Sequence, residues 1–182
     1  DVFRDKGVAN TAVSDIVRHA GVAQGTFYLY FSSKDDAICA LVQHLLEDTL
    51  ADVRRAAASS DLSALEKLVV LRDALQAMSD EPHEIEITSV LHSPQNRDLH
   101  DRATEEFARQ IVPVLQGIIE QGIAEEAFSV ADPRVAAWFV VGGFLAYELS
   151  LDNPDDIPHT FDQLTRFVLR GLGYDGELPA AR

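Results

Sequence analysis

The feature that most constrains the fold is a pair of short helical segments separated by a glycine. Within residues 12–20, apolar side chains recur at every third or fourth position, which is the period of one helix face. Gly21 follows at once and can end that helix in a left-handed conformation. Residues 24–31 then place Phe27 and Phe31 four positions apart, on one core-facing side. Two short helices joined by so tight a turn predict a compact helical unit.

The second of these helices carries mostly polar side chains away from its core-facing side. They are Gln24, Thr26, Tyr28 and Tyr30, with Gly25 among them and Lys34 just beyond. Amide and hydroxyl groups can reach base edges or phosphates, and a tyrosine hydroxyl can donate to a phosphate oxygen. Gly25 lets the backbone approach DNA closely, and amides at the helix start offer a phosphate contact. A supporting helix, a tight turn and such a second helix predict a helix-turn-helix that reads DNA.

In the rest of the chain, too, apolar residues recur at helical period, and no alternating apolar and polar pattern of a strand stands out. Val2 and Phe3 resemble the last turn of a first helix that ends at Gly7, and we expect residues upstream of this sequence to complete it. The later helices are expected at about 33–57, 62–78, 83–91, 97–121, 133–151 and 159–172. We therefore predict an all-α protein of about nine helices. Residues 1–45 would form a three-helix helix-turn-helix unit with a truncated first helix, and residues 46–182 a helical bundle.

Charge and composition exclude several other classes. The formal net charge of −15 argues against a protein that coats nucleic acid through bulk charge. Residues 6–34 nevertheless hold three basic residues and one acidic residue, a net of +2, so this part can lie against phosphates. The most apolar stretch, residues 135–151, contains Glu148 and two glycines, and we expect no membrane span. The single cysteine, Cys39, excludes an internal disulfide and fits the cytoplasmic location that we expect.

The N-terminal residues also match a known pattern in order and spacing. The matching elements are Phe3-x-x-x-Gly7, Thr11-Ala12-Val13-x-Asp15-Ile16, Ala20-Gly21-Val22, Gly25-Thr26-Phe27-Tyr28-x-Tyr30-Phe31 and Ser33-Lys34-Asp35. With them the chain resembles the tetracycline-repressor (TetR) family of bacterial transcriptional regulators. The resemblance implies a homodimer with one helix-turn-helix per subunit and a larger C-terminal ligand-binding domain. It also implies DNA contacts at Ala12, Val13, Ala23, Gln24, Gly25, Tyr28, Leu29, Tyr30 and Lys34, to which Thr26 is added from its place on the exposed face.

One position departs from the family pattern. The family often has Thr or Ser where Ala12 stands, and such a side chain caps the helix that follows. Since Ala12 has no group that can accept this bond, we expect Thr11 to take over and the helix start to shift. We further expect an upstream arm to supply basic groups that touch DNA.

Two later helices carry more apolar surface than a single core needs. The residues that we expect in a four-helix interface with a second subunit are Trp138, Val141, Gly142, Leu145, Ala146, Leu149, Phe161, Leu164 and Val168. Small residues at some of these steps permit close helix approach. The alternative is ordinary core packing, which accounts for some members of this set.

An effector pocket is expected among the helices between residues 62 and 151. Its candidate lining is Arg72, Leu75, Met78, Leu91, His92, Phe107, Gln110, Ile111, Trp138, Phe139 and Phe144. Most of these side chains are apolar or aromatic, which favours a small hydrophobic or aromatic effector. Each one taken singly is more often a core or surface residue than a ligand contact.

The sequence has few features that indicate metal binding or catalysis. Its histidines lack the helical His-x-x-x-His spacing of a metal site, so we expect no metal and no cofactor. It has neither a glycine-rich phosphate loop nor a nucleophile elbow, and Cys39 lies in an apolar stripe, so we expect no enzyme. We favour a dimeric, ligand-responsive repressor that binds a palindromic operator in double-stranded DNA. The alternative is a helical small-molecule-binding or protein-interaction module that does not bind DNA.

Overall fold

The structure is a computed structural model of the 182-residue chain, and it describes residues 1–80, 97–150 and 157–176. These ranges form eight helices and contain no strand, so the expected all-α class is confirmed. The helices are α1 (Val2–Lys6), α2 (Val13–Ala20), α3 (Gln24–Tyr30), α4 (Lys34–Ala58), α5 (Ala64–Asp80), α7 (Arg97–Ala124), α8 (Pro133–Leu149) and α9 (Ile157–Gly171). The helix expected at residues 83–91 lies outside the described residues.

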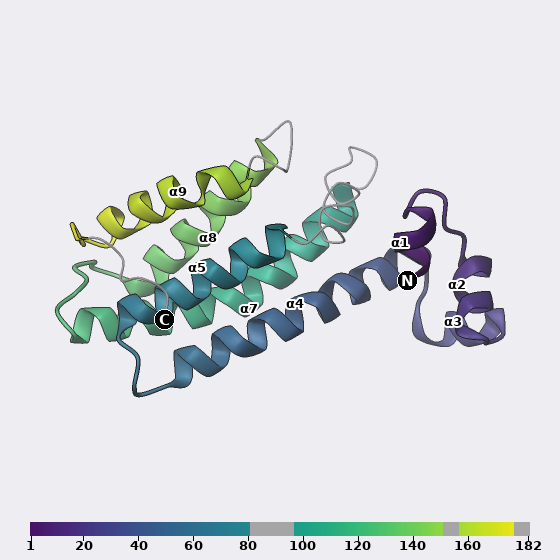
Figure 1. Ribbon diagram of the computed structural model, residues 1–182, viewed down its shortest axis with the longest axis horizontal. Coiled ribbons are helices and arrows are strands. Elements are labelled where there is room, and N and C mark those ends of the chain that lie inside the picture. The colour runs from purple at the N-terminus through teal and green to yellow at the C-terminus, as the bar shows by residue number, and fades with distance from the viewer. Residues whose placement is uncertain (81–96, 151–156, 177–182) are drawn as a thin grey trace.

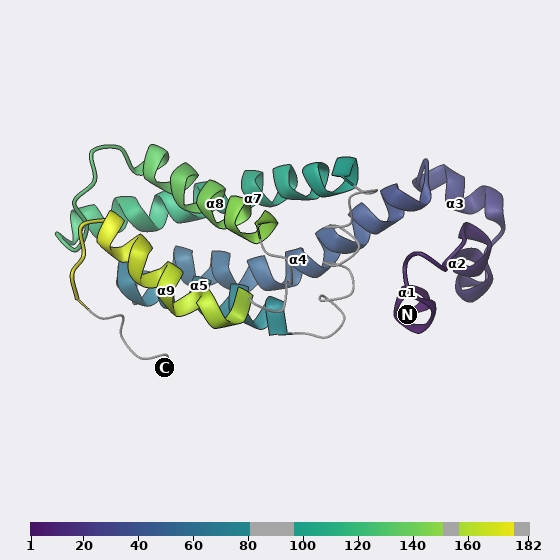
Figure 2. The ribbon, with the colours of Figure 1, turned by 90° about the horizontal axis from the view of Figure 1, so that it is seen from above.

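The helices are arranged as a small head and a larger body joined by one long helix. Figures 1 and 2 show α1, α2 and α3 grouped at one end, while α5, α7, α8 and α9 lie together away from them. We call residues 1–33 the head and α5, α7, α8 and α9 the body. Helix α4 leaves the head and packs against α5 and α7. The domain boundary expected after residue 45 falls inside this continuous helix.

The core of the body is built from apolar side chains of all its helices and of the second half of α4. Its buried members include Leu50, Val53, Leu68, Leu71, Ile111, Leu115, Ile118, Ile119, Val141, Leu169 and Leu172. Full burial of one such side chain contributes about 1.5–3 kcal/mol relative to leaving it exposed. This core holds the body together and anchors α4, so that the head is carried on a supported helix.

The head has a much smaller core. Val8, from the loop after α1, packs with Ile38 and Cys39 near the start of α4. Val17 of α2 and Phe27 of α3 are also buried. The turn between α2 and α3 forms as the sequence predicts, because Gly21 has φ +69° and ψ +27°, the left-handed conformation that glycine adopts without strain. The two helices of the helix-turn-helix are therefore closely packed on few apolar contacts.

Candidate nucleic-acid interface and effector region

Helix α3 presents the side chains that the sequence predicted to read DNA. Phe27 is buried and stacks against Phe31, with ring centroids 5.3 Å apart, and this contact anchors the helix to the head. The outer surface carries Leu29 and Tyr30, which are 82% and 78% exposed, and Tyr28, which is about half exposed. Gln24, Gly25, Ala23 and Ala12 are exposed as well, whereas Thr26 and Val13 are partly buried. All ten predicted DNA-contact residues thus lie in the head or at the first residue of α4.

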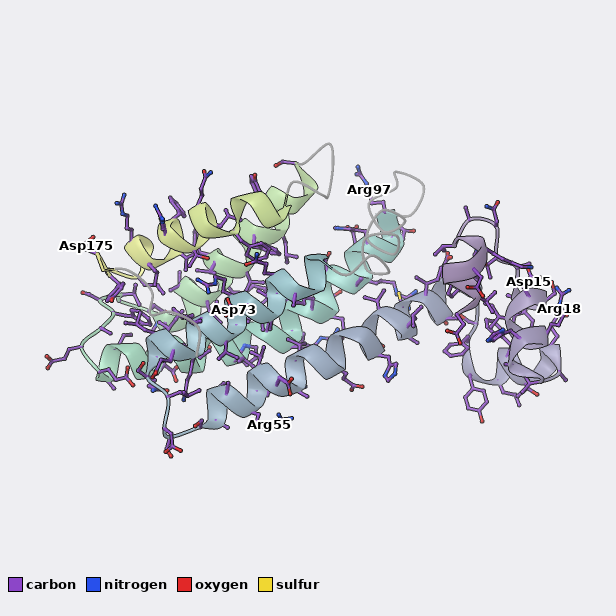
Figure 3. The ribbon with its side chains drawn as sticks, viewed as in Figure 1. Asp15, Arg18, Arg55, Asp73, Arg97 and Asp175 are labelled. Atoms are coloured by element: carbon purple, nitrogen blue, oxygen red, sulfur yellow. The ribbon has the colours of Figure 1, made fainter. Side chains whose placement is uncertain are left out.

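A carboxylate holds α1 and α2 together beside this surface. Asp15 accepts hydrogen bonds from the Lys6 ammonium at 2.8 Å and from the backbone N–H of Ala12 at 3.1 Å, and it pairs with the Arg18 guanidinium. The bond from Lys6, then that from Ala12, lowers the pKa of Asp15 below its ordinary value. Figure 3 shows Asp15 and Arg18 together on the head. Two of the three basic side chains in residues 6–34, Lys6 and Arg18, are thus already paired with Asp15 within the chain.

The start of α2 differs from the expectation for Thr11. Helix α2 begins at Val13 with Ala12 as its N-cap, and no side chain accepts a hydrogen bond from its first turn. Thr11 does not take over this role, because its hydroxyl is buried and donates to the carbonyl oxygen of Gly7 at 2.7 Å. The cap is therefore half of a capping box, made by the Asp15 carboxylate alone.

Lys34 has an intramolecular partner that the sequence gave no reason to expect. Its ammonium donates to the carbonyl oxygen of Val8 at 2.9 Å and so ties the start of α4 to the loop between α1 and α2. An ammonium has three N–H donors, so one such bond leaves others for a phosphate. Ser33 caps α4, because its hydroxyl accepts a hydrogen bond from the backbone N–H of Asp36 at 3.0 Å.

The junction between head and body contains a contact that sequence reasoning missed. The Arg102 guanidinium, near the start of α7, donates to Asp36 near the start of α4 at 2.8 Å. Asp36 also accepts from the hydroxyl and the backbone N–H of Ser32. The Ser32 hydroxyl first, then Arg102, lowers the pKa of Asp36 from 3.8 to about 2. No periodic signal links residues 66 positions apart, so only the fold reveals this pair.

A cavity of about 260 Å³ lies beside this contact, between α4 and α7. Its lining is Cys39, Val42, Gln43, Arg102, Ala103, Glu105, Glu106 and Arg109. The sequence did not predict a cavity here. Burial raises the pKa of the Cys39 thiol, which disfavours the thiolate and makes the side chain a poor nucleophile.

Nine of the eleven candidate effector residues fall into three groups. Ile111 is buried in the core, and Leu75, Phe107 and Phe144 are partly buried, with the Phe144 ring 5.7 Å from that of Phe161. The polar candidates have partners within the chain, since Arg72 pairs with Asp73 and Gln110 accepts from Arg54 at 2.6 Å. The Met78 side chain, Leu91 and His92 lie outside what the structure describes.

Two aromatic residues expected in the pocket lie elsewhere. Trp138 is about half exposed and Phe139 is 77% exposed, so both lie on the outer side of α8 in the described part of the chain. The helical period identified α8 as apolar on several sides but did not say which side faces the core. Helix α8 turns Ala137 and Val141 inward, and this choice places Trp138 and Phe139 outside.

The candidate interface residues fall into exposed, partly buried and buried groups. Trp138, Gly142 and Ala146 are exposed on α8, and Leu145, Leu164 and Val168 are partly buried. Val141 and Phe161 are buried by the chain itself, which removes them from its outer face. The Leu149 side chain is not described. The sequence set omitted Val135 and Phe167, which are exposed on α8 and α9 and which a search for apolar side chains off the core stripe would have found.

Metal and membrane sites were also sought in the described part of the chain. It holds no group of three or more His, Cys, Asp or Glu side chains placed to bind a metal ion. Among its helices, none combines the length and the apolar character that a membrane span requires.

Comparison with known proteins adds a family and a set of relatives. Residues 1–38 match the family described as bacterial regulatory proteins, tetR family. The chain is 50% identical over 54 residues to the uncharacterized HTH-type transcriptional regulator YvdT of Bacillus subtilis (strain 168), a match that covers 30% of the chain and 28% of that protein. It is 28% identical over 148 residues to the fatty acid metabolism regulator protein of the same organism, covering 78% and 73% of the two chains.

One solved structure extends the likeness to the whole fold. It is the transcriptional regulator FadR from Bacillus subtilis in complex with stearoyl-CoA, with a TM-score of 0.61 and 23% identity over 93% of both chains. Its similarity covers head and body together.

Proposed function

Because the chain belongs to the TetR family of bacterial transcriptional regulators, we propose that it binds a palindromic operator as a homodimer and leaves it when an apolar effector binds the body. The observation that carries this proposal is the outer surface of α3. Leu29 and Tyr30 are exposed on a helix that Phe27 anchors firmly from behind. Large apolar and aromatic side chains held in this way are costly to leave in water and fit a groove of DNA.

The second subunit is proposed to dock on the outer faces of α8 and α9. Val135, Trp138 and Phe139 follow one another at three- and one-residue steps, and all three are exposed on α8. Phe167 is 78% exposed on α9. Gly142 and Ala146 continue the α8 face and would let a partner helix approach closely. Burial of this face between two copies removes apolar surface that a monomer leaves in water.

Dimerisation would set the distance between the two α3 helices that contact DNA. Two heads related by a two-fold axis can enter successive major grooves when their α3 helices are about 34–36 Å apart. Each subunit then reads one half-site, and the affinity for a palindrome greatly exceeds that for a single half-site. An effector that prefers a dimer with a different spacing releases DNA by up to its differential affinity for the two states.

A long-chain acyl thioester is the effector class that we propose. The fatty acid metabolism regulator is a relative over most of the chain, and a structure of similar fold holds stearoyl-CoA. In this chain Leu75, Phe107 and Phe144 are partly buried apolar side chains on three body helices. By residue number, Leu75 and Phe144 fall in the C-terminal halves of α5 and α8, and Phe107 falls in the N-terminal half of α7. These are the halves of the three helices that lie nearer the head in Figure 2.

The proposal is tested by measuring the binding of purified protein to fragments of its own promoter region. We expect one fragment to bind tightly and specifically, with affinity that falls steeply with salt because phosphate contacts release counterions. Charging the outer face, by Phe139→Glu or Phe167→Glu, should yield a monomer and weaken operator binding at least a hundredfold. Ala51→Glu places the same charge on an exposed position of α4 and serves as the control.

Effector binding is tested on the same complex. Stearoyl-CoA should release the operator, whereas CoA without an acyl chain should not. If the chain binds no promoter fragment even at low salt, the DNA-binding function is wrong and the alternative, a helical binding module, is favoured. If it binds DNA but ignores acyl-CoA of every chain length, the effector class alone is wrong.

A further inference from the structure

The part of α3 that points farthest from the head is apolar. With 100° of rotation per residue, Gly25 and Leu29 lie almost opposite the buried Phe27 and follow each other by one turn. Leu29 is 82% exposed, more than any other large apolar side chain in the described part of the chain. We call Gly25 and Leu29 the α3 ridge. No other residue in the described part of the chain covers it.

The fold does not require glycine at position 25. The φ of Gly25 is not positive, unlike that of Gly7 or Gly21, and a Cβ built there meets no atom within 4 Å. Glycine in the middle of a helix is less favourable than alanine by about 0.5–1 kcal/mol, which is an upper bound for Gly25 in the first turn of α3. The head therefore gives up stability for an empty space on its outer surface. Such a space is useful when something outside the chain approaches closely.

The polar side chains of α3 lie on either side of the ridge. Gln24 and Tyr28 lie on one flank, and Thr26 and Tyr30 lie on the other. Groups on the flanks of a helix in the major groove face the walls, where phosphate oxygens accept hydrogen bonds. With α3 in the major groove, the ridge would face the floor of the groove, and Gly25 and Leu29 have no side-chain donor or acceptor. The central contact of α3 with the bases would then be apolar.

The major groove offers one strongly apolar group, the C5 methyl of thymine. We propose that Leu29 contacts a thymine methyl in each half-site, and that Gly25 is glycine because a side chain there would hold the helix away from the bases. This inference rests on the proposed function, since it requires α3 to enter the groove. It makes Leu29 a specificity-determining residue that acts without a hydrogen bond.

The test replaces thymines of the operator by uracil one at a time, which removes the methyl and keeps base pairing. For the unmodified protein, we expect one position per half-site at which uracil weakens binding about fourfold, the effect of one buried methyl group. Leu29→Ala should bind the thymine operator more weakly and show no further loss with uracil at that position. The four dissociation constants form a cycle that isolates the contact between side chain and methyl.

Two variants serve as controls. Val22→Ala removes methyl groups from a partly exposed side chain in the turn before α3, and it should keep the full uracil effect. Gly25→Ala should leave the thermal unfolding temperature unchanged or higher, because alanine favours helix, yet should weaken operator binding at least tenfold. That combination separates a role at the DNA surface from a role in folding.

The possible results distinguish this inference from the proposed function. Tight operator binding with no thymine sensitive to uracil would overturn the inference and leave the function standing. A full uracil effect in Leu29→Ala would show that another side chain contacts the methyl and would also overturn it. Unimpaired operator binding by Gly25→Ala would show that a side chain at position 25 does not hold α3 away from the bases, and it would overturn that part of the inference. A chain that binds no DNA at all would overturn both.

Discussion

The head and the body of this protein are held together in different ways. The body has a continuous apolar core to which α4, α5, α7, α8 and α9 all contribute. The head has few buried apolar side chains, and polar contacts connect its parts, from Lys6 to Asp15 and from Thr11 to Gly7. A third contact, from Lys34 to Val8, ties the head to the start of α4. A core of many side chains tolerates local change, whereas a small unit depends on each contact.

The difference bears on how the proposed ligand response could pass from the body to the head. The described contacts between body and head run through α4 and through the Asp36–Arg102 pair. A change in the body can therefore move the head as a unit without disturbing its internal contacts. The predictions below test this division.

The largest effect is expected from the body core. Ile119→Ala should destabilise the body by about 2–5 kcal/mol, because Ile119 is completely buried and its removal leaves a cavity. Chemical denaturation followed by circular dichroism measures the change. Ile119→Val, which removes one methylene, should cost about 0.5–1.5 kcal/mol. Equal losses for the two variants would mean that the site can collapse around the missing atoms.

A smaller effect is expected in the head, from a single polar contact. Thr11→Val keeps the shape of a side chain that is 2% exposed but loses the hydrogen bond to the Gly7 carbonyl oxygen. We expect the head to lose about 1–3 kcal/mol, because a buried carbonyl is left without its donor. Hydrogen exchange of α2 and α3 amides measures this loss, and Thr11→Ser, which keeps the hydroxyl, is the control. Faster exchange throughout the body would contradict separate stabilisation of the two parts.

The junction should show a pH dependence of defined sign. The pKa of Asp36 is lowered from 3.8 to about 2, so its contacts stabilise the folded chain above about pH 4 and are lost as the pH falls toward 2. Asp36→Asn should therefore lower the melting temperature at neutral pH, and the gap from the unmodified protein should narrow through that window. Arg102→Gln removes one partner of Asp36 and should also lower the melting temperature at neutral pH. Its difference from the unmodified protein should shrink over the same pH range. A difference independent of pH would exclude the carboxylate as its source.

The smallest effects are expected from two exposed ion pairs, one in the head and one on α4. Arg18→Ala in the head and Arg55→Ala on α4 each remove one partner of a pair whose arginine is largely exposed. Both should change the folding free energy by less than about 0.5 kcal/mol, because water and salt screen such pairs. Urea titration of the two variants measures this. A clearly larger loss for Arg18→Ala would mean that Lys6 and Ala12 do not suffice to hold Asp15.

Most of the helices could be predicted from local sequence. The residues that end α2 and cap α4, Gly21 and Ser33, act on their immediate neighbours, so their effects are written in a few adjacent positions. The prediction for Thr11 was wrong because a competing acceptor, the Gly7 carbonyl, lies within reach only once the loop has folded. The outward positions of Trp138 and Phe139 were missed because α8 is apolar on nearly every side, and periodicity then gives no direction.

By itself, the sequence determined the class of the fold, the helix-turn-helix and the identity of the side chains along α3. These depend on helical period and on turn residues, which act over one or two turns. Only the tertiary structure decided which face of α8 is left open, where Lys34 donates its hydrogen bond, and that Asp36 meets Arg102 beside a cavity. Each of these depends on how distant segments pack, and packing is set by the shape of the whole chain rather than by any local pattern.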